Sequence, residues 1–426
     1  MPQIQEKWLR VLKGFLFGEV CLQLINAVTG LLLVRWMSVE QFAQYSVANA
    51  FQSGAQQFVE FGLGGALVAL VGKEVSDRRR MGRLVAAGCH IRRNTLLIVG
   101  SISAIVFPVW FASKGWSLWT GLVLSVVIFA YLVVSGLQTY YRPPLAIHGE
   151  LGQVYRITLV SQFARLAAFA LAHVVHTITA PLAIFVNFAA TWFTGVRFKS
   201  AAHRHLEVPE GSAPAESREI LAYIRPIMPG VVFAAIQSQL AVFVAAAFGQ
   251  TQTIAEVGAL GRLAILLGFF SAANSMLVAP FIARQDRARL FPRYLLVAIC
   301  AILVAASMLS AAWAFPSLLL TILGSTYADS TPALLPMVAG ASIGYLNEVL
   351  WTMNSARKWV FWWMPVVSIP GTLAVQVLGI WLFDVSTAAG VFLMILMGAA
   401  FVLLTRLNVA LWGFRLDAKA AQGVGN

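Results

Sequence analysis

Twelve apolar stretches follow one another along the chain, separated by short polar segments. They cover residues 14–34, 44–71, 95–113, 117–139, 156–172, 178–196, 226–248, 254–283, 294–315, 332–354, 360–382 and 387–412. A helix of about 20 residues crosses about 30 Å of hydrocarbon, and most of these stretches reach that length, the fifth being marginal. The pattern therefore predicts an all-α membrane protein with twelve transmembrane helices.

Lysine and arginine residues fall almost entirely in alternate gaps between these stretches. We assign 26 of the 30 basic residues to one side of the membrane, whereas Arg35 and Lys114 lie in opposite gaps and Arg165 and Arg262 lie within stretches. By the positive-inside rule, the basic side and both chain termini are predicted to be cytoplasmic. Basic loops facing an anionic leaflet then account for the net charge of +13, so membrane lipids are expected as partners and nucleic acid is not.

The composition supports this class. Hydrophobic residues make up 59% of the chain and charged residues 11%, whereas a water-soluble domain carries about 25% charged residues. The first stretch is long enough to span and no small-residue cleavage site follows it, so we expect it to stay as an uncleaved helix. The three cysteines, Cys21, Cys89 and Cys300, are not expected to form disulfides.

A polar segment divides the chain nearly in half. Residues 197–225 form the longest break on the predicted cytoplasmic side and contain Pro209, Gly211, Ser212 and Pro214. We therefore expect an N-terminal six-helix bundle at residues 1–196, a cytoplasmic linker at 197–225 and a C-terminal six-helix bundle at 226–426. Within the linker, residues 216–225 predict either a short amphipathic helix on the inner leaflet or an extension of the seventh stretch.

The two halves show a weak internal repeat. A shift of 215 positions lays Gly14 on Pro229, Ala43 on Gly258 and Arg142 on Arg357. Because each half has an even number of stretches, the halves share one orientation, which predicts a pseudo-twofold axis along the membrane normal. Two such bundles would face each other across a cleft, where transporters that alternate access bind near the midplane.

Polar residues recur at helical spacing inside four stretches. These stripes are Glu19, Gln23, Asn26 and Gly30; Tyr45, Asn49, Gln52, Gln56 and Glu60; Thr158, Ser161, Gln162 and Arg165; and Tyr345, Glu348, Thr352 and Ser355. Such spacing places each set on one face of its helix. The third stretch has no stripe, so we expect the striped helices to line a wet cavity and the others to face lipid.

Charged residues within the stretches need a partner or water, because a charge at the bilayer centre costs about 2.5 to 3.5 kcal/mol on insertion scales. Glu60, Arg165 and Glu348 are predicted to lie deep, with either a functional role or a static interhelical ion pair. Glu19 and Arg262 lie nearer an interface, where snorkelling to the headgroups is an equal alternative. The amides are candidates for a cavity lining or for hydrogen bonds between helices.

Sequence motifs for catalysis are missing. No GxxxxGK[ST] phosphate loop occurs, and the aspartates are scattered singly. His203 and His205 have no third ligand at metal spacing, so a metal site is not predicted. Together with the short loops on the outer side, these observations argue against a membrane enzyme such as a glycan polymerase, and no cofactor is expected.

Two pairs of segments carry a family resemblance. Residues 34–45, with the sequence VRWMSVEQFAQY, and Glu60-Phe61-Gly62-Leu63 resemble the opening of Wzx-type oligosaccharide-lipid flippases. Residues 226–229 and the segment EVGALGRL at 256–263 are similar to the corresponding part of the second half. These flippases belong to the multidrug, oligosaccharidyl-lipid and polysaccharide (MOP) exporter superfamily. Family members usually have glycine where this chain has Ala43.

The resemblance implies a function. A Wzx-type flippase translocates a polyprenyl-pyrophosphate-linked oligosaccharide, such as an O-antigen, capsule or exopolysaccharide repeat unit, from the cytoplasmic to the outer leaflet of a bacterial inner membrane. It works by alternating access, with a polysaccharide polymerase and other assembly proteins as partners. The implied central cavity is cationic, and Arg165 and Arg262 are the arginines that we expect within stretches to hold pyrophosphate or acidic sugars.

The other striped residues complete the expected site. Asn26, Asn49, Gln52 and Gln56 are expected to line the cavity with the two arginines. Glu60, and after it Glu19 and Glu348, are candidates for coupling to a proton or sodium gradient, because a desolvated carboxylate titrates nearer neutrality. The alternative is a MATE-like antiporter for cationic drugs, which would favour an acidic and aromatic lining.

Overall fold

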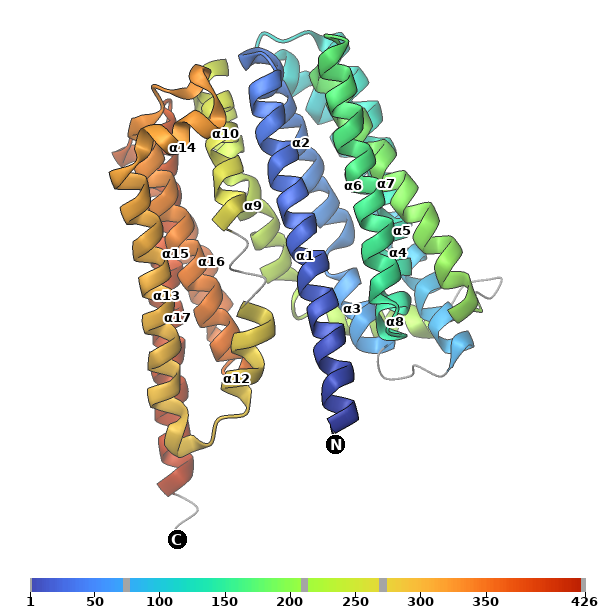
Figure 1. Cartoon of the computed structure of the whole chain (residues 1–426), viewed down its shortest axis with the longest axis vertical. Helices are drawn as coiled ribbons and strands as arrows, with labels where there is room; N and C mark the ends of the chain where they lie inside the picture. The colour runs from blue at the N-terminus through green and yellow to red at the C-terminus, as the bar shows by residue number, and fades with distance from the viewer. Residues whose placement is uncertain (1, 72–76, 208–213, 268–273, 423–426) are drawn as a thin grey trace. The chain divides into compact units, whose positions relative to one another are not determined.

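The structure is a computed structural model that describes residues 2–71, 77–207, 214–267 and 274–422, and it contains no β-strand within those ranges. Helices hold nearly all of these residues (Figure 1). In chain order they are α1 (Pro2–Trp36), α2 (Val39–Glu60), α3 (Leu63–Val71), α4 (Arg78–Ala112), α5 (Leu118–Ile147), α6 (Leu151–Val174), α7 (Ala180–Ala202), η1 (His203–His205), α8 (Pro214–Ile224), α9 (Met228–Phe248), α10 (Thr251–Leu267), η2 (Asn274–Val278), α12 (Ala279–Ala283), α13 (Arg287–Ala314), α14 (Pro316–Leu323), η3 (Ser325–Tyr327), α15 (Thr331–Ala356), α16 (Trp363–Leu382) and α17 (Ala388–Gln422).

Among the described residues, nine helices are long and apolar enough to cross a membrane, and the bent pair of α2 and α3 would make a tenth. The all-α membrane class is thereby confirmed. The predicted sixth stretch corresponds to α7, which is not one of the nine. The predicted eighth stretch is divided between α10 and α12, and residues 268–273 lie outside the described part of the chain. The count of twelve spans and the axis relating the halves stay predictions.

The helices form two compact units. One contains residues 1–29 and 36–239, and the other contains residues 30–35 and 240–426. In the first unit α5 packs against α4 and α7, and in the second α15 packs against α13 and α17. Figure 1 shows α13, α15, α16 and α17 running together within the second unit. In each half of the chain, the helix of the fourth stretch thus packs against the helices of the third and sixth, as an internal repeat would produce.

Each unit includes a segment from the other half of the sequence. In the first unit, Ser238 of α9 accepts a hydrogen bond from the Gln57 side chain of α2, with an N–O distance of 3.0 Å. In the second unit, Arg35 at the end of α1 donates to the backbone carbonyls of Thr321 and Ile322 at the end of α14. A cation at a helix C-terminus is favourable because the terminal carbonyls carry a partial negative charge. The predicted boundary at residues 197–225 is not tested by this division and stays a prediction.

A sharp bend separates α2 from α3. The two helix axes differ by 42°, and Gly62 between them has a φ of +94°, a backbone conformation that favours glycine. A side chain at this position would also approach Ile227, because an ideal Cβ would lie 3.4 Å from its Cδ1 atom. The bend places Glu60, the last residue of α2, at a break in the helix rather than in its interior.

Within the predicted linker, α8 is a separate helix that packs on the first unit. Ile220 and Ile224 are fully buried, in one apolar cluster with Leu67 of α3 and Leu84 of α4. The predicted short helix before the seventh stretch is confirmed, and the alternative of an extension of the next span is wrong, because α8 ends at Ile224 and α9 begins at Met228. That α8 lies on the inner leaflet stays a prediction. Pro209, Gly211 and Ser212 of the linker lie outside the described residues.

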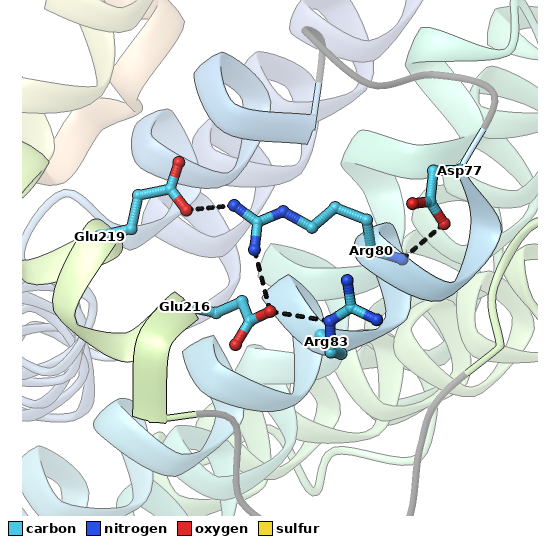
Figure 2. A network of polar contacts seen from close by, with 5 residues as sticks. All are labelled: Asp77, Arg80, Arg83, Glu216 and Glu219. Carbon is cyan, nitrogen blue, oxygen red and sulfur yellow. Dashed lines mark hydrogen bonds and ion pairs between the residues drawn. The ribbon is translucent and has the colours of Figure 1, made fainter.

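An ionic cluster fixes the polar face of α8 (Figure 2). Glu216 accepts hydrogen bonds from Arg80 and Arg83 of α4, at 2.9 and 2.7 Å, and Glu219 accepts from Arg80 as well. The side chain of Glu216 is 8% exposed. Burial alone would raise the pKa of Glu216, but hydrogen bonds from Arg83, from its own backbone and from Arg80 outweigh it, so the pKa of this carboxyl is lowered.

A buried arginine joins α4 to α5. Arg92 is 3% exposed, and its guanidinium donates to the Ser135 hydroxyl at 2.8 Å and to the backbone carbonyl of Leu132. Gly136 leaves room for it, because an ideal Cβ there would lie 2.6 Å from Arg92 Nη1. The predicted third stretch begins at residue 95, whereas α4 begins at Arg78, so Arg92 lies on a helix and not in a loop. The carbonyls of Leu132 and Val133 and the Ser135 hydroxyl, all on α5, hold the two Nη atoms, whereas the buried Nε atom has no partner among the described residues. This burial against one helix indicates a structural role.

Replacing Glu216 by Gln should lower the stability of the protein by about 1 to 3 kcal/mol at neutral pH, because two arginines lose their buried carboxylate. Glu219→Gln is the matched control and should cost less than about 1 kcal/mol, since its side chain is 41% exposed. Thermal unfolding of the purified protein in detergent measures both. Because the pKa of Glu216 is lowered on folding, its contribution is complete above the carboxyl's unfolded pKa of about 4.3 and is lost as the pH falls through the folded value. Equal effects of the two variants would contradict the assignment.

Gly136→Ala should lower the unfolding temperature, because the new methyl group displaces a buried guanidinium from its acceptors; such changes cost roughly 1 to 3 kcal/mol. In an Arg92→Leu background the same substitution should cost little, since the shorter side chain leaves the space open. Gly65→Ala, with no atom within 4 Å of an added Cβ, is the control and should be neutral or stabilising. An unchanged cost of Gly136→Ala in the Arg92→Leu background would show that Arg92 is not the cause.

Candidate functional site

A polar cavity of about 230 Å³ lies within the first unit. Among the described residues that line it, all except Ala190 are polar; they are Asn49, Gln52, Ser53, Tyr131, Gln138, Thr158, Ser161, Gln162, Arg165, Asn187, Thr191 and Thr194. They come from α2, α5, α6 and α7. The polar stripes of the second and fifth stretches therefore meet at one cavity, while the apolar faces of the same helices pack elsewhere.

Arg165 on α6 supplies the positive charge of the cavity. Its Nη2 atom donates a hydrogen bond to Asn26 Oδ1 of α1 at 2.7 Å, and the residue is half-buried. Asn26 is a neutral amide, so this contact orients the guanidinium without cancelling its charge. Two residues expected on different helices, Arg165 and Asn26, are thus brought into direct contact.

Two buried amide oxygens in the cavity wall have no hydrogen-bond partner among the described residues. They are Gln52 Oε1 and Gln162 Oε1, and Gln52 is 4% exposed. A buried acceptor that is left unmade costs about 1 to 3 kcal/mol, so these oxygens call for donors from water or from a ligand. Neighbouring hydroxyls are already engaged: Ser161 donates to the Ala190 carbonyl at 2.8 Å and Thr194 to the same carbonyl at 2.9 Å.

Glu60 lies beside the cavity, at the end of a hydrogen-bonded chain. The Tyr131 hydroxyl donates to Gln56 Oε1 at 2.8 Å, and Gln56 Nε2 donates to Glu60 Oε1 at 3.0 Å. Thr139 of α5 donates to the same carboxylate oxygen at 2.9 Å. Two donors on one oxygen suit an acceptor-only carboxylate. With the described residues Glu60 forms no ion pair, so hydrogen bonds to neutral groups, and not a salt bridge, hold it in place.

Glu19 makes a separate contact. Its Oε1 atom accepts from Gln23 at 3.3 Å on the same helix, and its Oε2 atom accepts from the Tyr155 hydroxyl of α6 at 3.4 Å. Gly18 permits this approach, because an ideal Cβ there would lie 2.6 Å from the Tyr155 ring. Glu19 does not line the polar cavity described above.

Arg262 and Glu348 belong to the second unit. The Arg262 side chain on α10 passes over Gly30, where an ideal Cβ would lie 3.1 Å from its Cδ atom. Glu348 on α15 is half-buried and lies within electrostatic range of Arg406 on α17. Arg406 donates to the Asn347 carbonyl and lies 5.6 Å from the centre of the Trp351 ring. That Arg262 and Glu348 belong to the same functional site as Arg165 stays a prediction.

Several polar residues of the cavity were not predicted from the sequence. Asn187, Thr191 and Thr194 recur at i, i+4 and i+7 on α7, and Tyr131 and Gln138 recur at i and i+7 on α5; this spacing could have revealed both stripes. Besides Arg165 and Arg262, Arg92 and Arg406 lie on long apolar helices, α4 and α17. Arg406 also falls within the predicted twelfth stretch, at residues 387–412.

Comparisons with known proteins bear on the fold. No family model and no curated protein sequence matches the chain. Among solved structures, an inward-facing MATE-family multidrug resistance transporter of the MOP superfamily matches with a TM-score of 0.70 at 13% identity, over 94% of this chain and 96% of that one. The lipid II flippase MurJ in an inward closed conformation matches with a TM-score of 0.74 at 13% identity, over 95% and 89%. A eukaryotic MATE transporter matches with a TM-score of 0.63 at 12% identity, over 98% and 99%.

At these identities the likeness concerns the fold. It extends over nearly the whole of each chain, so neither half is matched alone. The chain is a multi-pass membrane protein with the fold shared by MATE transporters and the lipid II flippase MurJ.

Proposed function

We propose that this protein is a flippase that moves a polyprenyl-pyrophosphate-linked oligosaccharide across a bacterial inner membrane by alternating access, with both termini in the cytoplasm. The observation that carries this proposal is the lining of the polar cavity. It consists of amides, hydroxyls and one arginine, and among the described residues no aspartate or glutamate lines it. Such a lining suits hydroxyl-rich and anionic groups better than cations.

The chemistry of the lining matches the parts of a lipid-linked glycan. Sugar hydroxyls can donate to the buried oxygens of Gln52 and Gln162, and the Arg165 guanidinium can hold a pyrophosphate or an acidic sugar through charge-assisted hydrogen bonds. The volume of about 230 Å³ lies below the roughly 300 to 1,000 Å³ of most small-molecule pockets. The cavity of the first unit would therefore hold one part of the substrate. Arg262 of the second unit stays a separate candidate for binding pyrophosphate or an acidic sugar.

The lining of the polar cavity also favours a flippase over a cation antiporter. A cation antiporter is the second candidate, because two of the three structures described above are MATE transporters. Glu19 and Glu60 are the acidic residues that could serve a cation, but both are held by neutral donors outside the cavity lining. We favour transport over catalysis, with a polysaccharide polymerase and other assembly proteins acting on the flipped product.

Arg165→Ala should trap the lipid-linked glycan in the cytoplasmic leaflet. The assay is the leaflet distribution of the glycan in cells that lack this protein and carry a plasmid copy. Loss of a charge-assisted hydrogen bond, worth about 1.5 to 3 kcal/mol, should reduce translocation roughly 10-fold to 100-fold. Arg93→Ala, an exposed arginine on α4, is the matched control and should complement fully. Glycan that reaches the outer leaflet equally well without the protein would contradict the flippase function and favour the exporter.

Glu60→Gln should abolish the dependence of transport on an ion gradient while leaving the protein level unchanged. Glutamine keeps an oxygen for Thr139 and Gln56 but cannot change its charge, so a coupling role is removed and the local structure is kept. Glu40→Gln is the control, because Glu40 lies on the same helix, is exposed and also accepts from a glutamine. The measurement is transport in vesicles with and without an imposed proton or sodium gradient. Gradient dependence that survives in Glu60→Gln would assign coupling to another residue.

A further inference from the structure

A second cavity of the first unit lies between α6 and α7, near the ends of these helices that the charge pattern predicts to be cytoplasmic. Its volume is about 340 Å³. Its lining is Gln153, Arg156, Ile157 and Val160 from α6, and Phe193, Arg197, Ser200 and Ala201 from α7. The two helices run side by side in Figure 1 and pack against each other.

This cavity uses a different face of α6 from the polar cavity. The residues of α6 that line this cavity recur at i, i+3, i+4 and i+7. The polar-cavity residues Thr158, Ser161, Gln162 and Arg165 have the same spacing but begin five residues later. At 3.6 residues per turn the two faces lie roughly 140° apart around the helix. Large apolar side chains on the outer surfaces of these helices, including Phe163 and Trp192, are more than half exposed, as expected for helices that face lipid.

The lining changes from basic to apolar along the helices. Arg156 lies five residues from the start of α6 and Arg197 five residues from the end of α7, roughly 8 Å from each helix end. Val160 and Phe193 lie nine residues from the same ends, roughly 14 Å into the helices. The Arg197 guanidinium lies 5.4 Å from the centre of the Phe193 ring. A ligand with a charged head and an apolar body fits this arrangement.

The two arginines of this cavity are accessible to a ligand. Neither Arg156 nor Arg197 forms an ion pair with a described residue, and both are exposed. The nearest carboxylate in sequence, Glu150, is engaged by Arg204 and by His205, whose Nε2 atom lies 2.9 Å away. Burial alone would raise the pKa of Glu150, but hydrogen bonds from His205 and Arg204 outweigh it and lower the pKa, so its charge is already matched.

We propose that this cavity binds an anionic phospholipid of the surrounding bilayer. The phosphate diester would lie between the guanidinium groups of Arg156 and Arg197, which form directional hydrogen bonds with phosphate oxygens. Ser200 would add a hydroxyl donor, and an acyl chain would run along Val160 and Phe193. Basic pockets between transmembrane helices on the cytoplasmic side are suited to such headgroups. The inference goes beyond the proposed function, since it requires no particular transport substrate.

Binding of defined lipids to the purified full-length protein tests the proposal. Native mass spectrometry compares dioleoyl phosphatidylglycerol with dioleoyl phosphatidylcholine, which has the same acyl chains and a zwitterionic headgroup. The wild type should prefer phosphatidylglycerol, and the double variant Arg156→Gln/Arg197→Gln should bind it about 30-fold more weakly, as expected for two basic residues near the headgroup. The double variant should also lose the preference for phosphatidylglycerol over phosphatidylcholine.

Two further double variants control for a general loss of positive charge and for misfolding. Arg93→Gln/Arg218→Gln loses the same charge at two exposed positions outside the cavity and should bind as the wild type does. Arg156→Lys/Arg197→Lys keeps the charge and should retain most of the preference, which distinguishes lost binding from misfolding. An equal loss in the Arg93 and Arg218 pair, or no loss in the Arg156 and Arg197 pair, would overturn the proposal.

Competition identifies the source of the phosphate. Inorganic pyrophosphate and glycerophosphoglycerol, which carry phosphate without acyl chains, should displace phosphatidylglycerol only at concentrations far above those of the lipid. Displacement by either at equal concentration would show a site for free phosphate groups and would overturn the assignment to a bilayer lipid. Because binding is read directly, failure of this proposal leaves the flippase function untouched, and failure of the flippase function leaves this one untouched.

Discussion

A polar group within hydrocarbon must find a partner inside the protein, and this constraint organises the first unit. Water is scarce there, so an amide, hydroxyl or charge on a spanning helix is favoured where a neighbouring helix or a wet cavity can satisfy it. The hydrogen bonds from Arg165 to Asn26 and from Thr139 to Glu60 each join two helices. Polar stripes on four helices consequently converge, and the cavity that they line is a by-product of satisfying them together.

Two arginines show how the same constraint yields different roles. Arg92 is 3% exposed and is surrounded by acceptors of α5, with Gly136 making room for it. Arg165 is half-buried, contacts a neutral amide and lines a cavity. The first arrangement leaves no access for a ligand, whereas the second presents a charge to the space where a ligand can enter. Arg165 is a candidate binding residue and Arg92 a structural one because, of the two, only Arg165 lines the polar cavity. Position along an apolar stretch does not distinguish them.

Hydropathy and helical spacing predicted the class of the protein and much of the cavity. Spacing along each helix was enough to assign Asn49 and Gln52 to one face of α2 and Arg165 to one face of α6. These two faces line the same cavity. Spacing gives no information on what covers that face. The short helix that carries Ile220 and Ile224 was therefore predicted, but not the burial of these two side chains against α3 and α4. The helical environment of Arg92 was not predicted for a related reason, since hydropathy locates the end of an apolar stretch and not how far the helix continues beyond it.

The central claim is that the polar cavity of the first unit is built for anionic, hydroxyl-bearing lipid-linked groups and not for cations. Equilibrium binding to the purified protein tests this most directly, with undecaprenyl pyrophosphate and the lipophilic cation tetraphenylphosphonium as the two probes. The account predicts that the pyrophosphate lipid binds, that Arg165→Gln weakens this binding at least about tenfold, and that the cation does not compete. Binding of tetraphenylphosphonium that depends on Glu60 and is indifferent to Arg165 would contradict the account.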